Sequence, residues 1–282
     1  MRDIPDQIRR LVDRWVEGGT PGQPPIPWPR QRWLEDFPGN AAALALLPDR
    51  LDRAAVRTAC ADASRSPAQA VEAFLAVMAW GFGDSVGYGR YRTRRILASR
   101  SDSAPRLHAV AQAIVTDGPL AGYHALASPG VSRLHGLGPS FGTKLLYFWQ
   151  PADRRPRALI LDAFVAKWLE REVDWRLDPL AWSVDTYRRY LDQMHAWAEA
   201  LGIEPDEFEI LTRGVRVSQA TVMGATISLD DGPWRSLDLA RKTGRLILEN
   251  AAIAAVLAER EADPVRGPVL VNRPGVGEAE WS

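Results

Sequence analysis

The chain has 282 residues, of which 46% are hydrophobic and 25% are charged, a composition that is ordinary for a soluble globular protein of one large or two small domains. Its 35 basic residues balance its 35 acidic residues, which weighs against a strongly basic nucleic-acid-binding protein, although a local patch can still bind phosphate. A single cysteine excludes a disulfide framework within the chain and a four-cysteine iron–sulfur cluster. The sequence shows no signal-peptide core and no apolar stretch of membrane-spanning length. We therefore expect a cytoplasmic protein without a membrane partner.

The N-terminal part combines a helix with an extended arm. Apolar side chains recur at helical spacing over residues 4–17, which predicts a helix. Residues 20–29 contain five prolines and predict an extended arm, with tryptophans and arginines beside it. These tryptophans and arginines could hold nucleic acid, or they could fix the arm to the core. We therefore expect residues 1–30 to form a separate N-terminal segment.

A strongly apolar helix is predicted over residues 67–79, after an alanine-rich helical stretch at 40–60. Ser66 and Pro67 supply its cap and its first position, which both residues favour. The helix leads into residues 80–95, which contain four glycines and four arginines among aromatic side chains. No strand or βαβ pattern surrounds these glycines, which excludes a nucleotide-binding Gly-x-Gly-x-x-Gly signature.

Two interpretations of residues 80–95 stay open. In the first, the glycines bring the backbone close to a flat base, aromatic rings stack on it and the arginines hold phosphate. In the second, the stretch is a helix-breaking loop that leads into an amphipathic helix with a solvated basic face. The base-pocket candidates of the first interpretation are Trp80, Phe82 and Tyr88, and its phosphate candidates are Arg90, Arg92 and Arg94, with Arg95 in the same basic run.

Two helices are predicted over residues 105–116 and 119–127, and a glycine-dense turn follows at 134–144, which ends in Phe-Gly-Thr-Lys. Glycine reaches backbone conformations that are closed to other residues. Consecutive amide N–H groups next to a helix N-terminus make a natural phosphate site. The predicted phosphate-binding positions of this turn are Gly136, Gly138, Gly142 and Thr143.

Lys144 follows the turn and is predicted to lie in the first turn of an apolar helix. The positive end of the helix dipole would lower the pKa of the lysine there and make its amine a candidate nucleophile. The other lysines of the chain are Lys167 and Lys242. Asp162 is predicted to cap a second helix over residues 163–171. If the two helices pack together, its carboxylate lies beside the amine, where it can stabilise positive charge or move a proton.

These two segments resemble the helix-hairpin-helix DNA glycosylases, specifically the lyase-type branch that includes 8-oxoguanine DNA glycosylase and its actinobacterial-type members. In that family a Leu-x-Gly-x-Gly hairpin precedes a catalytic lysine, and an apolar segment further on carries a catalytic aspartate. Residues 141–144 and 161–168 match these pieces. The turn is longer than the usual hairpin, and Lys167 stands where arginine is more common. Residues 129–134 would form the first helix of the hairpin motif.

The resemblance implies a mainly α-helical, two-lobed bundle with a helix-hairpin-helix motif and a substrate cleft between the lobes. It implies a nucleoid-associated enzyme of base excision repair that flips a damaged or modified base, such as an oxidised purine, out of double-stranded DNA. Lys144 would attack C1′ of the sugar, and Asp162 would stabilise the developing charge. Phe148 lies one helical turn after the lysine, where the family has a pocket-lining residue, and would stack on the base. No cofactor and no metal are expected.

The rest of the chain divides near residue 213. Further helices are predicted over residues 183–201 and from 204 onward, which completes a glycosylase-like domain at 31–213. Val-, Thr- and Ile-rich residues 215–230 predict a short β-hairpin, and residues 237–262 a helix. Residues 214–282 thus form a C-terminal extension of unknown role.

Two other functions are compatible with these patterns. The same fold can act as an N-glycosidase on a free modified nucleoside or nucleotide, which suits a net charge of zero better than a duplex does. It can also be a non-catalytic DNA-binding module that keeps the hairpin for phosphate. The arginines of the connector, Arg154, Arg155 and Arg157, suit either a phosphate contact or a solvated loop.

Overall fold

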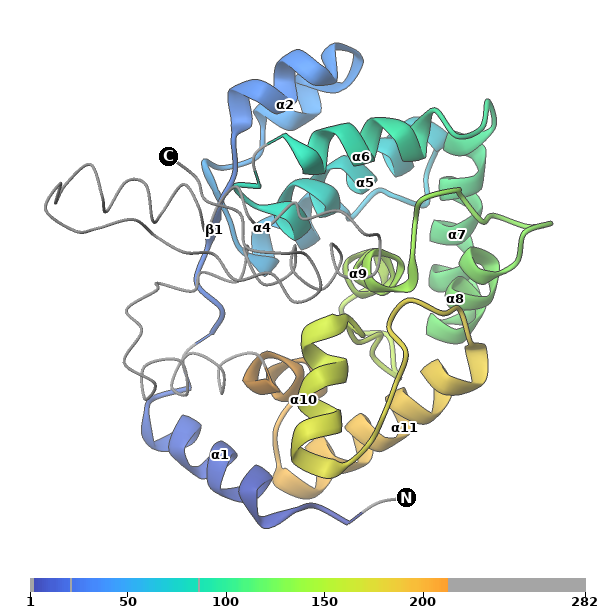
Figure 1. Ribbon diagram of the computed structural model, residues 1–282. Helices are drawn as coiled ribbons and strands as arrows, with labels where there is room; N and C mark the ends of the chain where they lie inside the picture. The colour runs from blue at the N-terminus through green and yellow to red at the C-terminus, as the bar shows by residue number, and fades with distance from the viewer. Residues whose placement is uncertain (1–2, 21, 86, 213–282) are drawn as a thin grey trace, which may run out of the picture. The chain divides into compact units, whose positions relative to one another are not determined.

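The computed structural model describes residues 3–20, 22–85 and 87–212, and this part of the chain is mainly helical, as predicted (Figure 1). The predicted C-terminal hairpin and helix, and the extension to which they belong, lie outside these residues. The helices are α1 (Asp6–Glu17), α2 (Arg30–Asp36), the 3-10 helix η1 (Pro38–Asn40), α3 (Ala41–Ala45), α4 (Arg53–Ala59), α5 (Pro67–Phe82), α6 (Tyr88–Leu97), α7 (Ser103–Asp117), α8 (Pro119–Ala127), α9 (Pro139–Trp149), α10 (Ala163–Val173) and α11 (Val184–Leu201), with further helical residues at 205–212. Strands β1 (Ile26–Pro27) and β2 (Arg50–Leu51) pair antiparallel.

Helix starts follow the capping signals of the sequence. The Ser66 hydroxyl accepts a hydrogen bond from the Gln69 amide at 3.2 Å, and α5 begins at the next residue, Pro67. Ser183 caps α11 in the same way. A cap satisfies amides that have no partner inside the helix, so these boundaries depend on neighbouring residues alone.

The proline-rich arm is docked on the core. Ile26 pairs with Leu51 across the short sheet, and the Trp28 indole donates a hydrogen bond to the Pro48 carbonyl at 2.8 Å. Trp28 and Trp33 are buried, with 6% and 1% of their surface exposed. Both tryptophans are therefore buried where the arm docks on the core and are not exposed for a nucleic-acid contact.

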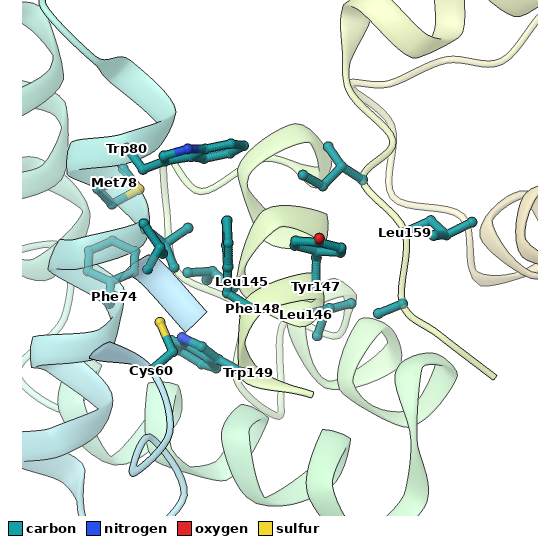
Figure 2. Packing of buried hydrophobic residues seen from close by; sticks show 14 of the residues in the cluster. Cys60, Phe74, Met78, Trp80, Leu145, Leu146, Tyr147, Phe148, Trp149 and Leu159 are labelled. Carbon is teal, nitrogen blue, oxygen red and sulfur yellow. The ribbon is translucent and has the colours of Figure 1, made fainter. Parts of the chain in front are cut away.

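Helix α9 lies at the centre of the packing, in contact with α4, α5, α7 and α8 (Figure 1). Lys144 and every residue after it in α9 are buried. Figure 2 shows its Leu145 and Phe148 facing Phe74, Met78 and Trp80 of α5, and its Trp149 beside Cys60. Within the described ranges, no helix combines the length and the apolar character that crossing a bilayer requires. The division into two lobes, the cleft between them and the boundaries at residues 30 and 213 stay predictions.

Two local predictions are wrong. Residues 129–132 form turns, residues 133–134 have no regular structure, and the helix that precedes the glycine turn is α8, which ends at Ala127. Gly130 and the β-branched Val131 come directly after Pro129 and favour a helix only weakly. Helix α5 in turn runs through Gly81 to Phe82, because tertiary packing outweighs the low helix propensity of one glycine.

Candidate active site

The side chains of Lys144 and Asp162 form a buried ion pair. Lys144 Nζ donates a hydrogen bond to Asp162 Oδ2 at 2.7 Å. Only 2% of the lysine side chain and 3% of the aspartate side chain are exposed. The second carboxylate oxygen, Oδ1, accepts from the amides of Phe164 at 3.0 Å and Val165 at 3.3 Å. Asp162 thus caps α10, as predicted, and holds an amine with its other oxygen.

The position of Lys144 along its helix differs from the prediction. Helix α9 begins at Pro139 with Gly138 as its N-cap, so Lys144 lies in the second turn. The helix dipole acts mainly within the first turn. The end of α9 therefore cannot be what makes this amine a nucleophile, and its nearest charged partner is the Asp162 carboxylate.

Three hydroxyl groups hold segment 159–162 in place, one on α9 and two on α11. The Leu161 amide donates to Thr143 Oγ1 at 3.0 Å. The hydroxyls of Tyr187 and Tyr190, on α11, donate to the carbonyls of Leu159 at 2.9 Å and Ile160 at 2.8 Å. These bonds fix the chain directly before Asp162. The sequence offered no signal for the tyrosines, because they lie more than two dozen residues from the carbonyls that they contact.

The amine of Lys144 is bordered by partly exposed aromatic rings. Its Nζ lies 5.3 Å from the centroid of the Phe141 ring. That ring stacks on Phe82 at 4.4 Å, and Phe82 meets Tyr88 edge-on at 5.9 Å. All three rings are half-buried. Phe141 was not among the predicted site residues, although its position one helical turn before the lysine was a usable signal.

Two glycines of residues 80–95 make room for these rings. A Cβ atom at Gly81 would lie 2.5 Å from Cε1 of Phe141, and one at Gly89 would lie 2.6 Å from Cβ of Phe82. Such distances do not occur between real side chains. In the structure both glycines therefore serve close packing of aromatic side chains next to Lys144.

The predicted base-pocket residues Trp80 and Phe148 lie in the core. Their exposed fractions are 1% and 2%, and their rings meet edge-on at 5.0 Å (Figure 2). Phe82 and Tyr88 lie closer to the surface. The structure brings all four aromatic residues to one side of α9, and their contact with a base stays a prediction.

The predicted phosphate-binding turn divides into two pairs of residues. Gly136, with a φ of +85°, is exposed and requires glycine, and Gly138 has open space around it. Gly142 and Thr143 lie inside α9 and are buried. A Cβ at Gly142 would lie 2.4 Å from the Trp182 ring. Gly136 and Gly138 thus remain candidates for phosphate contact, whereas Gly142 and Thr143 have packing tasks.

Substitution of Gly142 tests its packing role. Gly142→Ala should lower the free energy of unfolding by about 1–3 kcal/mol, the range for overpacking a filled core. Gly138→Ala, which adds the same methyl group in open space, is the matched control and should cost well under half as much. Thermal denaturation followed by circular dichroism measures both, and equal losses would contradict a packing role for Gly142.

The arginines near the site have different partners. Arg90 and Arg94 both pair with Asp36, whereas Arg92 donates to the hydroxyl of Tyr88 at 3.0 Å and to the carbonyl of Gly136 at 2.9 Å. This last bond joins α6 to the glycine turn, so the two unusual stretches of the sequence lie side by side. In the connector, Arg157 is buried and pairs with Asp206 at 3.5 Å, which is a structural role rather than a phosphate contact or a solvated loop.

A central helix thus buries a lysine against the capping aspartate of the next helix in a mainly helical protein. A family model described as "Putative 8-oxoguanine DNA glycosylase OGG-like protein" matches residues 19–212. The chain belongs to this family, and the resemblance drawn from the glycine turn and the Asp162 segment is confirmed. Family membership supports a DNA glycosylase as the class of activity and DNA as the partner. Comparisons with curated proteins and with solved structures found no match.

Proposed function

We propose that the protein is a DNA glycosylase with associated lyase activity, and that it removes an oxidised purine such as 8-oxoguanine from double-stranded DNA. The observation that carries this proposal is the buried pair of Lys144 and Asp162 in a chain of the 8-oxoguanine DNA glycosylase-like family. A buried ion pair is often no more stabilising than apolar residues of the same volume. A fold that needed stability alone would gain little from it, which favours a chemical role.

The geometry supports a route for the first proton. Lys144 must be a neutral amine when it attacks, and Asp162 Oδ2 at 2.7 Å is placed to accept its proton. The amine then bonds to C1′ while the bond from C1′ to the base breaks, and that electron pair leaves with the base. The proton passes on to the departing base, so that Asp162 regains its charge and stabilises the cationic sugar. The C1′–O4′ bond then breaks, O4′ takes its electron pair and one proton from the new C1′–nitrogen group, and the nitrogen forms the C=N bond of a Schiff base to Lys144.

The rings beside Lys144 supply a surface for an extruded base. Phe141 and Phe82 are partly exposed, and Phe141 lies next to the amine. A flipped base gains stacking energy on such rings, which offsets part of the cost of leaving the helix. Trp80 and Phe148 would line the same pocket at greater depth, and a base reaches them only if their edge-on contact opens.

Borohydride trapping tests the chemistry. The protein is incubated with duplexes that carry 8-oxoguanine, other modified bases or an abasic site, and borohydride reduces any Schiff base to a stable adduct. We expect an adduct on one modified duplex and on the abasic duplex, and none on plain DNA. Absence of an adduct on every duplex would contradict covalent chemistry at Lys144.

Electrophoretic mobility shift separates the alternatives. A glycosylase should prefer the abasic and modified duplexes over plain duplex, and a DNA-binding module should hold all three equally. An enzyme for free nucleosides, which the zero net charge favours, should bind none of them and should release base from a modified nucleoside. Each outcome identifies one of the three functions.

Gly138 offers a test of the glycine turn. The residue is the N-cap of α9, its φ of −93° and ψ of 171° suit any residue, and a side chain there meets open space. Aspartate and asparagine are both good N-caps, so neither should destabilise the fold. If phosphate lies at the turn, Gly138→Asp should weaken duplex binding by about 1 kcal/mol, or roughly fivefold, through charge repulsion. Gly138→Asn, the uncharged control, should bind as the wild type does, and equal affinity of both variants would place phosphate elsewhere.

A further inference from the structure

The four arginines of α6 fall into two pairs. Arg90 Nε lies 2.6 Å from one carboxylate oxygen of Asp36, and Arg94 Nη1 lies 3.2 Å from the other. Asp36 is the last residue of α2. One carboxylate therefore holds two arginines and joins α6 to α2. Both charges are partly compensated inside the protein.

The second pair is held by uncharged oxygens. Arg92 donates to the hydroxyl of Tyr88 and to the carbonyl of Gly136. Arg95 donates to the hydroxyl of Tyr91 at 3.3 Å, with its guanidinium 5.7 Å from that ring. Within the described ranges, neither Arg92 nor Arg95 pairs with a carboxylate, and α6 itself has none. Each keeps its full positive charge for an outside partner.

Arg92 lies toward the candidate site, and Arg95 follows it by three positions, one helical turn further along α6. Arg92 contacts the carbonyl of Gly136 in the glycine turn and the hydroxyl of Tyr88. The ring of Tyr88 leads through Phe82 to Phe141, which borders the Lys144 amine. Tyr91 on the same helix is 47% exposed. Direct contacts thus connect Arg92 to the aromatic rings beside the catalytic candidates, and Tyr91 and Arg95 are its neighbours on α6.

We propose that Tyr91, Arg92 and Arg95 form a strand-binding face that holds the phosphates of duplex DNA beside the extruded nucleotide. Arg90 and Arg94 instead hold α6 on α2 and do not contact DNA. The inference rests on the proposed function for its partner. Guanidinium groups match phosphate in shape and charge, and tyrosine hydroxyls are common donors to phosphate oxygens. A protein of zero net charge can bind DNA in this way, because the charge that counts is the local one.

The test compares two double variants of equal charge. Arg92→Gln with Arg95→Gln removes two uncompensated charges, and Arg90→Gln with Arg94→Gln removes the two charges held by Asp36. The affinity for a plain duplex is measured over a range of salt concentrations. The first variant should lower the slope of log affinity against log salt by about two, the value for two lost phosphate contacts. The second should leave the slope near the wild-type value and lower the melting temperature.

The outcomes are separable. The inference would be overturned if the first variant had the same salt slope as the wild type, or if both variants lowered the slope equally. It would also be overturned if the wild type did not bind duplex. Tyr91→Ala should weaken binding without changing the slope, since it removes no charge. Borohydride trapping reports on Lys144 independently. If the first variant changes the salt slope but the wild type forms no adduct, the strand-binding face is supported and the catalytic proposal is overturned. If the wild type forms an adduct but the first variant leaves the salt slope unchanged, the catalytic proposal is supported and the face is overturned.

Discussion

Replacement of Lys144 by glutamine should abolish the borohydride-trapped adduct on the modified duplex. The reaction needs a primary amine within reach of C1′, and an amide cannot form a Schiff base. The measurement is gel separation of the adduct after reduction, at enzyme excess. An adduct of wild-type yield from this variant would contradict the role of Lys144.

The Lys144→Gln variant should also be less stable than the wild type, because it breaks a buried ion pair. Glutamine at 144 leaves the Asp162 carboxylate buried without its cation, and the loss of one partner of a buried pair costs about 3–5 kcal/mol. The single variant therefore needs a companion, Lys144→Gln with Asp162→Asn, in which two neutral amides replace the pair. This double variant should regain much of the melting temperature and still form no adduct, which separates lost chemistry from lost structure.

Lys167 provides the matched control. It lies in α10, five positions after Asp162, and it is one of only three lysines in the chain. Lys167→Gln removes the same ammonium group from the neighbouring helix. Borohydride should still trap an adduct with this variant, and loss of the adduct would contradict Lys144 as the nucleophile.

Replacement of Asp162 by asparagine should slow base release by roughly 10²–10⁴-fold, the usual effect of losing an acid–base group. Asparagine can still accept the amides of Phe164 and Val165, so the start of α10 should survive. What is lost is the negative charge beside Lys144, and with it both the proton acceptor and the stabilisation of the cationic sugar. Single-turnover release of the base measures the rate, and binding of an abasic duplex checks that the surface is intact.

Asp162→Ala separates the two tasks of this side chain. Alanine removes the charge and the cap together, so the variant should lose a further 0.5–2 kcal/mol or so of stability relative to asparagine. Its rate of base release should match that of Asp162→Asn. A rate near wild type in either variant would leave Asp162 with a capping role alone.

The zero net charge of the chain is compatible with a DNA partner. Acidic residues compensate part of the arginine charge from within, since Arg90 and Arg94 share the one negative charge of Asp36 and Arg157 pairs with Asp206. The net charge of the whole chain therefore says little about the local charge on the surface that a partner contacts. Composition alone favoured a small substrate, whereas the family match supports DNA.

The amino-acid sequence by itself determined the features that depend on neighbouring residues. Ser66 and Pro67 begin α5, Asp162 caps α10, and Ser183 caps α11, because a cap acts within three residues of itself. The glycine turn and the Asp162 segment also carried the family resemblance, since both motifs are short and continuous. These features made Lys144 and Asp162 the candidates before any packing was known.

Only the tertiary structure decided which side chains meet. Lys144 and Asp162 are eighteen residues apart and meet at 2.7 Å, because Thr143 on α9 and two tyrosines on α11, Tyr187 and Tyr190, hold the segment directly before Asp162. Phe148 and Trp80 are enclosed in the core, whereas the ring of Phe141 borders the amine. Four arginines that look alike in the sequence differ in charge compensation, because Asp36 reaches two of them across more than fifty residues. Such contacts depend on how distant segments pack, and local propensity contains no information about them.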